Sequence, residues 1–531
     1  MKMFWSAFVA PVKAMIQYGS QVIDYRTAIA LVCALLLTGS AFPGVATAQN
    51  SPSSPQSIQP YLDRVIDRVS EFQLDNGMTF LVLQRDNTPT ISMVTYADVG
   101  GVDEPVGKTG VAHFLEHLAF KGTPRIGTTN YEAEKPLLAK LDAIFAEIKA
   151  ARAAGNTEQV AALEAEFDRV QAQVNEYAKQ NEYGQIIERE GGSGLNAATS
   201  ADYTLYFYSF PANKLELWMS LESERFLEPV FREFYKEKQV VLEERRLRTD
   251  NSPIGQLIEA FLDKAYTTHP YKRPVIGYDE DIRNLESQDV REFFKTHYVP
   301  SKLTVAIVGD VKPNQVRELA RTYFGRFPAQ PAATANIPTE PPQQATKEVT
   351  LRLESQPWYL EGYHRPSAND PDNAVYDLIV SLLSDGRTSR LYQSLVEKQR
   401  IALTAQGFSG FPGEKYPNLL VLYALTAPGQ SVSSVAEAFE QELNRLKTEA
   451  VTQQELERVK TQARASLLRS LDSNMGMAQL LAEYEVKTDD WRNLFERLDK
   501  IAAVTPADVQ RVAQATFIPE NRTIGRILPK E

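Results

Sequence analysis

The segment His113-Phe114-Leu115-Glu116-His117 places two of the chain's five histidines four residues apart, with a glutamate between them. Residues at positions i and i+4 lie on the same face of an α-helix, so both imidazoles can reach one metal ion. Glu116, three residues after the first histidine, projects beside the pair and is placed to deprotonate a metal-bound water. The alternative is a pair of surface histidines on an amphipathic helix, which is disfavoured because histidine is scarce here and a candidate third ligand follows.

That third ligand is expected to be a carboxylate on another helix, since a catalytic zinc ion keeps three protein ligands and an open position for water. The charged segment 234–244 is strongly helical in composition. Glu237 and Glu244 are seven residues apart and therefore share one helix face, whereas Glu243 points about 100° away from it. The residues alone also allow the alternative that all these carboxylates are surface charges in helical salt bridges.

The N-terminal region indicates export. An apolar run at about 27–46 follows a basic leader, is too short to span a membrane as a helix, and ends at the cleavage signal Ala46-Thr47-Ala48. We therefore expect residues 1–48 to be a signal peptide. The mature protein would be periplasmic or otherwise extracytoplasmic, without a stable membrane span; an uncleaved anchor is the alternative. Since the single cysteine, Cys33, would be removed, any metal site must use nitrogen and oxygen ligands.

Length and composition indicate a soluble protein of two domains. The chain has 531 residues, of which 43% are hydrophobic and 24% charged, with a net charge of -11. A negative charge of this size disfavours binding to nucleic acid or to anionic membranes. A Ser/Pro/Gln-rich leader, 49–62, is expected to be disordered, and a second stretch, 328–346, to link an N-terminal domain (63–327) to a C-terminal one (347–531).

The two halves share a sequence pattern. Asp289-Val290 and Asp508-Val509 are each followed by an aromatic residue, a β-branched residue and proline, and then by an apolar closing strand. Aligning Gly122 with Gly386 sets three residues of the second half, Asp377, Val380 and Ser381, against His113, Glu116 and His117. The second half is therefore expected to keep the fold and to lack the metal ligands.

Strands expected at 77–84, 91–98 and 203–210 alternate with helical segments. The predicted fold class is thus α+β, with two homologous domains that are each a mostly antiparallel sheet covered by helices.

Four motifs together resemble the pitrilysin/insulinase superfamily, whose inverted-zincin signature is H-x-x-E-H. They are His113–His117, Leu195-Asn196-Ala197-Ala198-Thr199-Ser200, Val240-Val241-Leu242-Glu243-Glu244 and His269-Pro270-Tyr271. Within the superfamily the chain is most similar to two-domain bacterial peptidases related to mitochondrial processing peptidase. The resemblance implies a zinc metalloendopeptidase in which the two domains form a clam-shell chamber.

The same resemblance implies the roles of individual residues. One Zn²⁺ per chain would be held by His113, His117 and Glu244, with Glu116 as general base and Glu237 orienting the site from behind. Asn196, Ala197 and Ala198 would lie on an edge strand that receives a peptide substrate as an added strand. The remaining histidines, at 269, 297 and 364, are expected to be structural.

Two features depart from the family pattern. The interval between His117 and Glu244 is unusually long, because a segment rich in Ala, Glu, Lys and Leu predicts an inserted helical hairpin at about 135–182, broken at Ala154-Gly155-Asn156. A solvated spur and a cap over the chamber are equally weighted roles for it.

The second departure lies in the C-terminal half, where self-sufficient relatives carry an Arg and, seven residues later, a Tyr that stabilise the oxyanion. Val396 and Leu403 stand at these positions and cannot donate a hydrogen bond. The resemblance then implies a heterodimer with a homologous subunit bearing the Arg/Tyr pair, unless the nearby Arg387, Arg390 or Tyr392 substitutes. The alternative function is a non-catalytic scaffold or assembly subunit.

Overall fold

The computed structural model of the protein describes residues 59–333 and 336–530, and the chain divides into two compact units, 1–67 and 68–531. The described part of the first unit is dominated by one helix, α2 (Gln59–Ile66). It overlaps the end of the leader that we expect to be disordered, and the expectation is wrong for 59–62. Leu62, Val65 and Ile66 recur at helical spacing, which favours this helix. The expected signal peptide lies outside the described residues, and within them no helix has the length and apolarity to cross a membrane.

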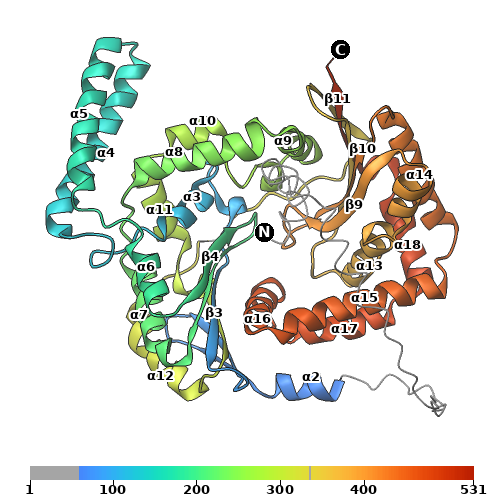
Figure 1. Ribbon diagram of the computed structural model, residues 1–531, viewed down its shortest axis with the longest axis horizontal. Helices are drawn as coiled ribbons and strands as arrows, with labels where there is room; N and C mark the ends of the chain where they lie inside the picture. Colours follow the sequence, from blue (N-terminus) through green and yellow to red (C-terminus); the bar gives the residue numbers. More distant parts are fainter. Residues whose placement is uncertain (1–58, 334–335, 531) are drawn as a thin grey trace, which may run out of the picture. The chain divides into compact units, whose positions relative to one another are not determined.

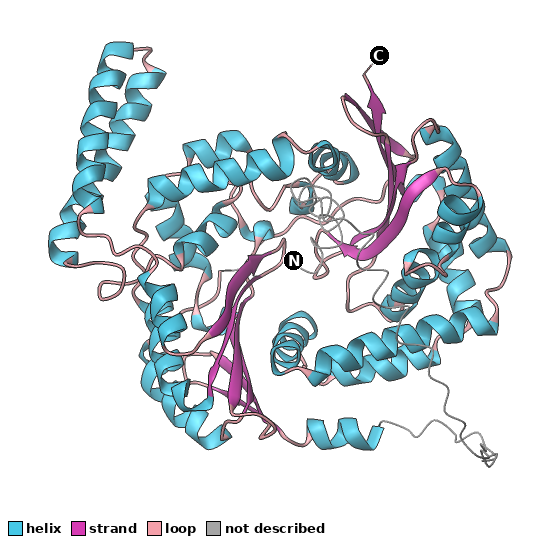
Figure 2. Ribbon diagram, in the orientation of Figure 1, coloured by secondary structure: helices cyan, strands magenta, loops and turns pink. Residues whose placement is uncertain are grey.

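The first half of the second unit is built on a six-stranded sheet in the order β1-β2-β6-β3-β5-β4 (Figures 1 and 2). Its strands are β1 (Val69–Gln73), β2 (Thr79–Gln84), β3 (Thr90–Ala97), β4 (Ser193–Thr199), β5 (Thr204–Pro211) and β6 (Leu303–Gly309). β2 and β6 are parallel and all other neighbours antiparallel. β6 lies in the interior of the sheet and is buried along its whole length, which explains its continuous apolar sequence.

The second half repeats this topology. Its five strands have the order β7-β11-β8-β10-β9 and are β7 (Lys347–Leu353), β8 (Trp358–Arg365), β9 (Ala402–Phe411), β10 (Asn418–Thr426) and β11 (Arg522–Pro529). β7 and β11 are parallel, and the other pairs antiparallel. Each strand thus matches its counterpart in β2-β6-β3-β5-β4 in order and direction. The predicted duplication and the α+β fold class are confirmed.

Helices cover both sheets and enclose one main hydrophobic core in each half. In the first half they are α3 (Val111–Leu118), α4 (Tyr131–Ala153), α5 (Thr157–Asn175), α6 (Glu182–Arg189), α7 (Leu215–Leu227), α8 (Phe234–Arg245), α9 (Pro253–Ala265), α10 (Asp279–Asn284), α11 (Ser287–His297) and α12 (Pro313–Tyr323). In the second half they are α13 (Asn373–Ser384), α14 (Val432–Thr448), α15 (Gln453–Asp472), α16 (Asn474–Thr488), α17 (Asn493–Ala503) and α18 (Pro506–Thr516).

Each half gives one helix to the sheet of the other. α9, from the first half, packs on β7 and β11, while α16, from the second half, packs on β3 and β6. The close approach of α9 depends on glycine: a Cβ atom at Gly362 would lie 2.7 Å from the ring of Phe261 on α9, and one at Gly525 would lie 3.2 Å from it. The halves are therefore joined by two exchanged helices.

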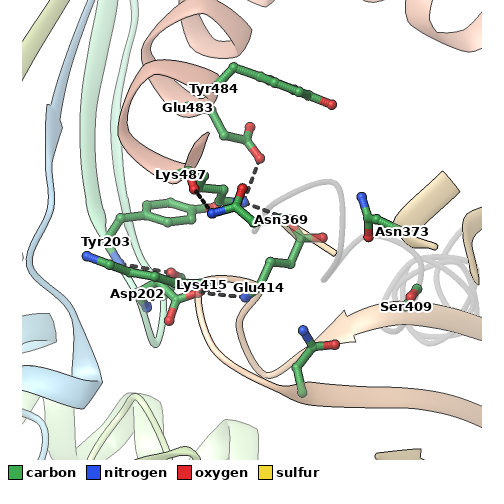
Figure 3. Close-up of polar contacts among 12 residues, drawn as sticks. Asp202, Tyr203, Asn369, Asn373, Ser409, Glu414, Lys415, Glu483, Tyr484 and Lys487 are labelled. Carbon is green, nitrogen blue, oxygen red and sulfur yellow. Dashed lines mark hydrogen bonds and ion pairs between the residues drawn. The ribbon is translucent and has the colours of Figure 1, made fainter. Parts of the chain in front are cut away.

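A partly buried polar cluster also joins the halves (Figure 3). Asp202, in the β4–β5 loop, accepts hydrogen bonds from the backbone N–H groups of Glu414 (2.6 Å) and Lys415 (3.0 Å). Lys487 of α16 bridges the carboxylates of Glu414 and Glu483, at 2.7 Å from each. Charges that lose contact with water need partners, and the ammonium group of Lys487 and the carboxylates of Glu414 and Glu483 provide them for each other.

The helical hairpin is present as α4 and α5, which pack on each other and are broken at Ala154–Asn156 as the sequence predicts (Figure 1). Its middle part contacts helix α8 of the first half. Tyr235 of α8 packs against Phe145 and Phe167, with ring centroids 4.9 Å apart in each pair, and its hydroxyl donates to Asp142 (3.0 Å). The hairpin is thus anchored on the helix that carries Glu237 and Glu244.

Candidate metal centre and its surroundings

The helix α3 carries the two histidines, and a buried carboxylate fixes where it begins. Its N-cap residue, Gly110, has φ 87° and no side chain to accept the first free N–H groups. Glu104 supplies the missing acceptor, since its two oxygens each lie 3.0 Å from a backbone nitrogen, those of Gly110 and Ala112. A Cβ atom at 110 would approach the carbonyl oxygen of Ile276 to 2.6 Å, so only glycine fits there.

The three residues expected to bind a metal lie close together. His113, His117 and Glu244 offer ligand atoms that all lie within 4.8 Å of one another. One oxygen of Glu244, Oε2, is 3.7 Å from Nε2 of His113 and 3.3 Å from Nε2 of His117. Two imidazoles and one carboxylate are a donor set that suits zinc in hydrolytic sites, so these residues fit the ion. Within the described part of the chain, no other group of three histidine, cysteine or acidic side chains is placed to hold a metal ion.

Glu237 lies behind His117, on the same face of α8 as Glu244. Its Oε2 is 3.3 Å from Nδ1 of His117, so this carboxylate accepts a hydrogen bond from Nδ1–H and leaves Nε2 directed at Glu244. The other oxygen, Oε1, accepts a hydrogen bond from the ammonium group of Lys121 at 2.5 Å, and Lys121 also pairs with Glu233 at 3.2 Å. Glu243 instead points away, half exposed, and pairs with Arg246.

Burial and charge set the protonation of this group in the protein without metal. Burial, together with the neighbouring His117, lowers the pKa of His113 to about 3, so that this imidazole is neutral. Burial opposes charge on His117, but hydrogen bonds to Glu237 and Glu244 outweigh it and raise the pKa of His117 to about 9. Glu244 is desolvated too, yet the two histidines and Arg248 lower its pKa to about 2. A metal would therefore have to displace a proton from His117.

Glu116 projects from α3 beside the histidines and is held by Thr199. The hydroxyl of Thr199 donates to Oε2 of Glu116 at 2.6 Å. Burial raises the pKa of Glu116, as is typical of a carboxylate that works as a proton acceptor near neutral pH. Thr199 is fully buried and is the last residue of β4.

Asn196, Ala197 and Ala198 lie on β4, at the edge of the first sheet. β4 pairs with β5 on one side and is the terminal strand of the sheet. The three side chains are partly buried, and α3 packs beside the strand. Backbone groups on the open side are available for pairing with an added strand.

Among the described residues of the second half, no comparable group of metal ligands is found. Asp377, Val380 and Ser381 lie on α13, the counterpart of α3, and Asp377 pairs with Arg497 at 2.7 Å. Val396 lies in a π-helical turn, 392–398, and packs against the core of its half, whereas Leu403 is exposed on β9. Of the nearby alternatives, Arg390 is engaged with Glu455 at 3.1 Å.

The other three histidines lie outside the metal group. His269 caps the turn at 270–272 and accepts from the N–H of Tyr271 (3.1 Å), His297 ends α11, and His364 lies in β8. Burial lowers the pKa of all three.

Sequence reasoning missed Thr199, Lys121 and Arg248 as neighbours of the site. Thr199 and Lys121 stand inside or beside quoted motifs, but nothing in their spacing shows what they contact. Arg248 is four residues after Glu244, and this spacing could have suggested its contact with that carboxylate.

Comparison with known families identifies the chain. The family model described as Insulinase (Peptidase family M16) matches residues 80–157 and 171–279, and that described as Peptidase M16 inactive domain matches 284–463. The protein belongs to peptidase family M16, as its resemblance to the superfamily implies. The interruption between 157 and 171 falls within α5, so most of this helix is left out of the match, whereas α4 lies inside it.

Individual relatives are peptidases by name. The zinc protease PqqE of Helicobacter pylori is 29% identical over 453 residues, which is 84% of this chain and 89% of that protein. A probable mitochondrial-processing peptidase subunit beta of Arabidopsis thaliana is 23% identical over 475 residues, covering 86% of this chain and 77% of that protein.

Solved structures share the fold. The crystal structure of a protease from Helicobacter pylori has a TM-score of 0.73 and 27% identity, covering 87% of this chain and 99% of that one. The periplasmic protease PqqL of Escherichia coli has a TM-score of 0.63 at 17% identity, covering 87% of this chain and 48% of that one, and shows the fold alone. The two-domain architecture agrees with a clam-shell fold.

Proposed function

We propose that the protein is an exported zinc endopeptidase, or the zinc-bearing subunit of one, that hydrolyses unfolded peptides. The observation that carries the proposal is the convergence of His113, His117 and Glu244 beside Glu116. Its zinc-protease relatives support the same chemistry. A non-catalytic scaffold subunit is the second candidate, but the chain has kept the complete set of ligands and the base, which a scaffold does not need.

The proposed mechanism assigns one task to each residue. Zinc, when bound by the two histidines and Glu244, would acidify a water molecule and polarise the scissile carbonyl. Glu116, oriented by Thr199, accepts the proton of the attacking water and delivers it to the leaving amine. Glu237 keeps His117 in the tautomer whose Nε2 faces the ligand group. An extended peptide pairs with the open side of β4 at Asn196–Ala198, a mode of binding that requires an unfolded segment.

A homologous partner and an extracytoplasmic location complete the proposal. Val396 and Leu403 leave the second half without oxyanion donors at the family positions, and the Arabidopsis relative is named as a subunit beta. We infer that a second subunit supplies the Arg/Tyr pair. The signal-like sequence of residues 1–48 supports export.

The test measures bound zinc and hydrolysis of a denatured protein by the mature chain, alone and with a candidate partner. His113→Ala should lose both zinc and hydrolysis, whereas Glu116→Gln should keep zinc and lose hydrolysis. Zinc binding without hydrolysis under any condition, with or without a partner, would favour the scaffold function instead. Failure of the wild-type chain to bind zinc would refute both the metal site and the proposed activity.

A further inference from the structure

The two carboxylate oxygens of Glu244 have different neighbours. Oε2 faces the Nε2 atoms of His113 and His117, at 3.7 and 3.3 Å. Oε1 lies 2.5 Å from Nη1 of Arg248 and points to this guanidinium. A guanidinium group stays protonated at any accessible pH, so the charge that faces Oε1 does not depend on pH. In this arrangement Oε2 faces the two histidines, whereas Oε1 is paired with Arg248.

An unusual backbone turn brings Arg248 to this place. α8 ends at Arg245, and the chain continues as a π-helical turn, Arg246–Asp250, closed by a 2.8 Å hydrogen bond from the N–H of Asn251 to the carbonyl of Arg246. Such turns are rare and occur often at functional sites. The turn is packed on α9, where a Cβ atom at Gly255 would lie 2.1 Å from the carbonyl oxygen of Arg248. This tight contact fixes the backbone from which Arg248 projects.

Arg246, two residues before Arg248, forms a similar Arg–Glu pair on this turn. Arg246 binds Glu243, three residues earlier, but both side chains are more than half exposed and lie away from the histidines. The Arg248–Glu244 pair is better buried, with side chains 39% and 19% exposed. The turn therefore carries two Arg–Glu pairs of the same chemistry, of which one adjoins the metal ligands.

We propose that Arg248 is a positioning residue that restricts Glu244 to ligation through a single oxygen, and so keeps one coordination position open for water or substrate. The inference rests on the zinc site of the proposed function. A carboxylate that binds through both oxygens would fill the fourth position, which hydrolytic zinc sites keep for the reacting water. Partners of metal ligands commonly change metal affinity about 10- to 100-fold when they are removed.

The experiment compares metal binding by three variants of the mature chain. Arg248→Gln removes the charge, Arg248→Lys keeps it without the planar fork, and Arg246→Gln is the matched control on the same turn. Zinc affinity is measured by competition with a chromogenic chelator. The absorption spectrum of the cobalt(II)-substituted protein reports coordination number, since visible bands weaken when cobalt goes from four ligands to five. Circular dichroism and thermal unfolding establish that each variant is folded.

We expect Arg248→Gln to change zinc affinity about 10- to 100-fold and to weaken the cobalt bands. Arg248→Lys should lie between this variant and the wild type, and Arg246→Gln should match the wild type. A folded Arg248→Gln with wild-type affinity and spectrum would overturn the inference, as would an equal effect of Arg246→Gln. If Arg248→Gln does not fold, a wild-type spectrum in Arg248→Lys together with wild-type affinity would also overturn it. Absence of metal binding by the wild type is a separate outcome, which refutes the proposed function itself.

Discussion

Replacing Thr199 by valine removes a single hydrogen bond to the proposed base while keeping the shape of the side chain. The hydroxyl of Thr199 lies 2.6 Å from Oε2 of Glu116, and Thr199 is fully buried, so water cannot take its place. A hydrogen bond to a charged group contributes about 1.5–3 kcal/mol. If this energy serves to orient Glu116 in the transition state, Thr199→Val should lower kcat by about 10- to 150-fold.

The assay is hydrolysis of a fluorogenic peptide under the conditions where the wild-type protein is most active, with zinc content measured in parallel. We expect kcat to fall while KM changes by less than about threefold, since the bond is proposed to act on the base and not on substrate binding. Zinc content should stay at the wild-type level, because Thr199 contacts no metal ligand in the described structure. Thr199→Ser, which retains the hydroxyl, should recover most of the activity.

The structure provides a matched control on the neighbouring strand. Thr204 is the register partner of Thr199, is equally buried, and donates its hydroxyl to the carbonyl of Val99 at 3.0 Å. Thr204→Val therefore removes a buried hydroxyl from the same pair without touching Glu116. Equal losses in the two valine variants would show that the effect is one of stability, and wild-type kcat in Thr199→Val would refute the positioning of Glu116 altogether.

Three further predictions concern the surroundings of the site and the fold. Lys121→Met should weaken zinc binding about tenfold in a competition titration, because Glu237 loses its cation, and Lys121→Arg should restore it; unchanged affinity in the methionine variant would contradict this role. Burial raises the pKa of Glu361 on β8 from 4.5 to about 7, so the folded state binds a proton more tightly than the unfolded state and loses about 3 kcal/mol of stability as the pH rises through this interval. Glu361→Gln should remove that decline and unfold at a higher temperature than the wild type at pH 8, whereas an identical pH profile would contradict it. Replacing 131–176 by a short turn should lower the Tm, because Tyr235 loses its aromatic neighbours, and should leave zinc bound; loss of zinc would show that the hairpin supports the ligand helix itself.

The sequence predicted the parts of the site that depend on local periodicity. The spacing of His113 and His117, and of Glu237 and Glu244, specifies which side chains share a helix face, and these faces do meet. The turn and closing strand that recur in both halves likewise predicted their common topology, because a turn and a strand can both be recognised from a few neighbouring residues.

Features that arise from tertiary contacts could not be predicted in this way. The bond between Thr199 and Glu116 joins residues far apart in the chain, and the neighbours of Lys121 come from another helix. The π-helical turn at 246–250 has no periodic signature, so only the four-residue spacing from Glu244 pointed to Arg248. The leader was placed too far along the chain because its polar composition masked the helical spacing of Leu62, Val65 and Ile66.

The exchange of α9 and α16 makes the two halves interdependent in folding. A polypeptide ending before the linker would expose Leu257 and Phe261 of α9, and would also lack the helix that covers β3 and β6. We expect such a fragment to aggregate, and the whole chain to unfold in one cooperative transition from about residue 68 onward. Cleavage within 328–346 should by contrast leave the two pieces associated, as subunits of a dimer would be. A fusion of two gene copies would produce this arrangement if the ancestor had been a homodimer in which each protomer packed a helix on the sheet of the other.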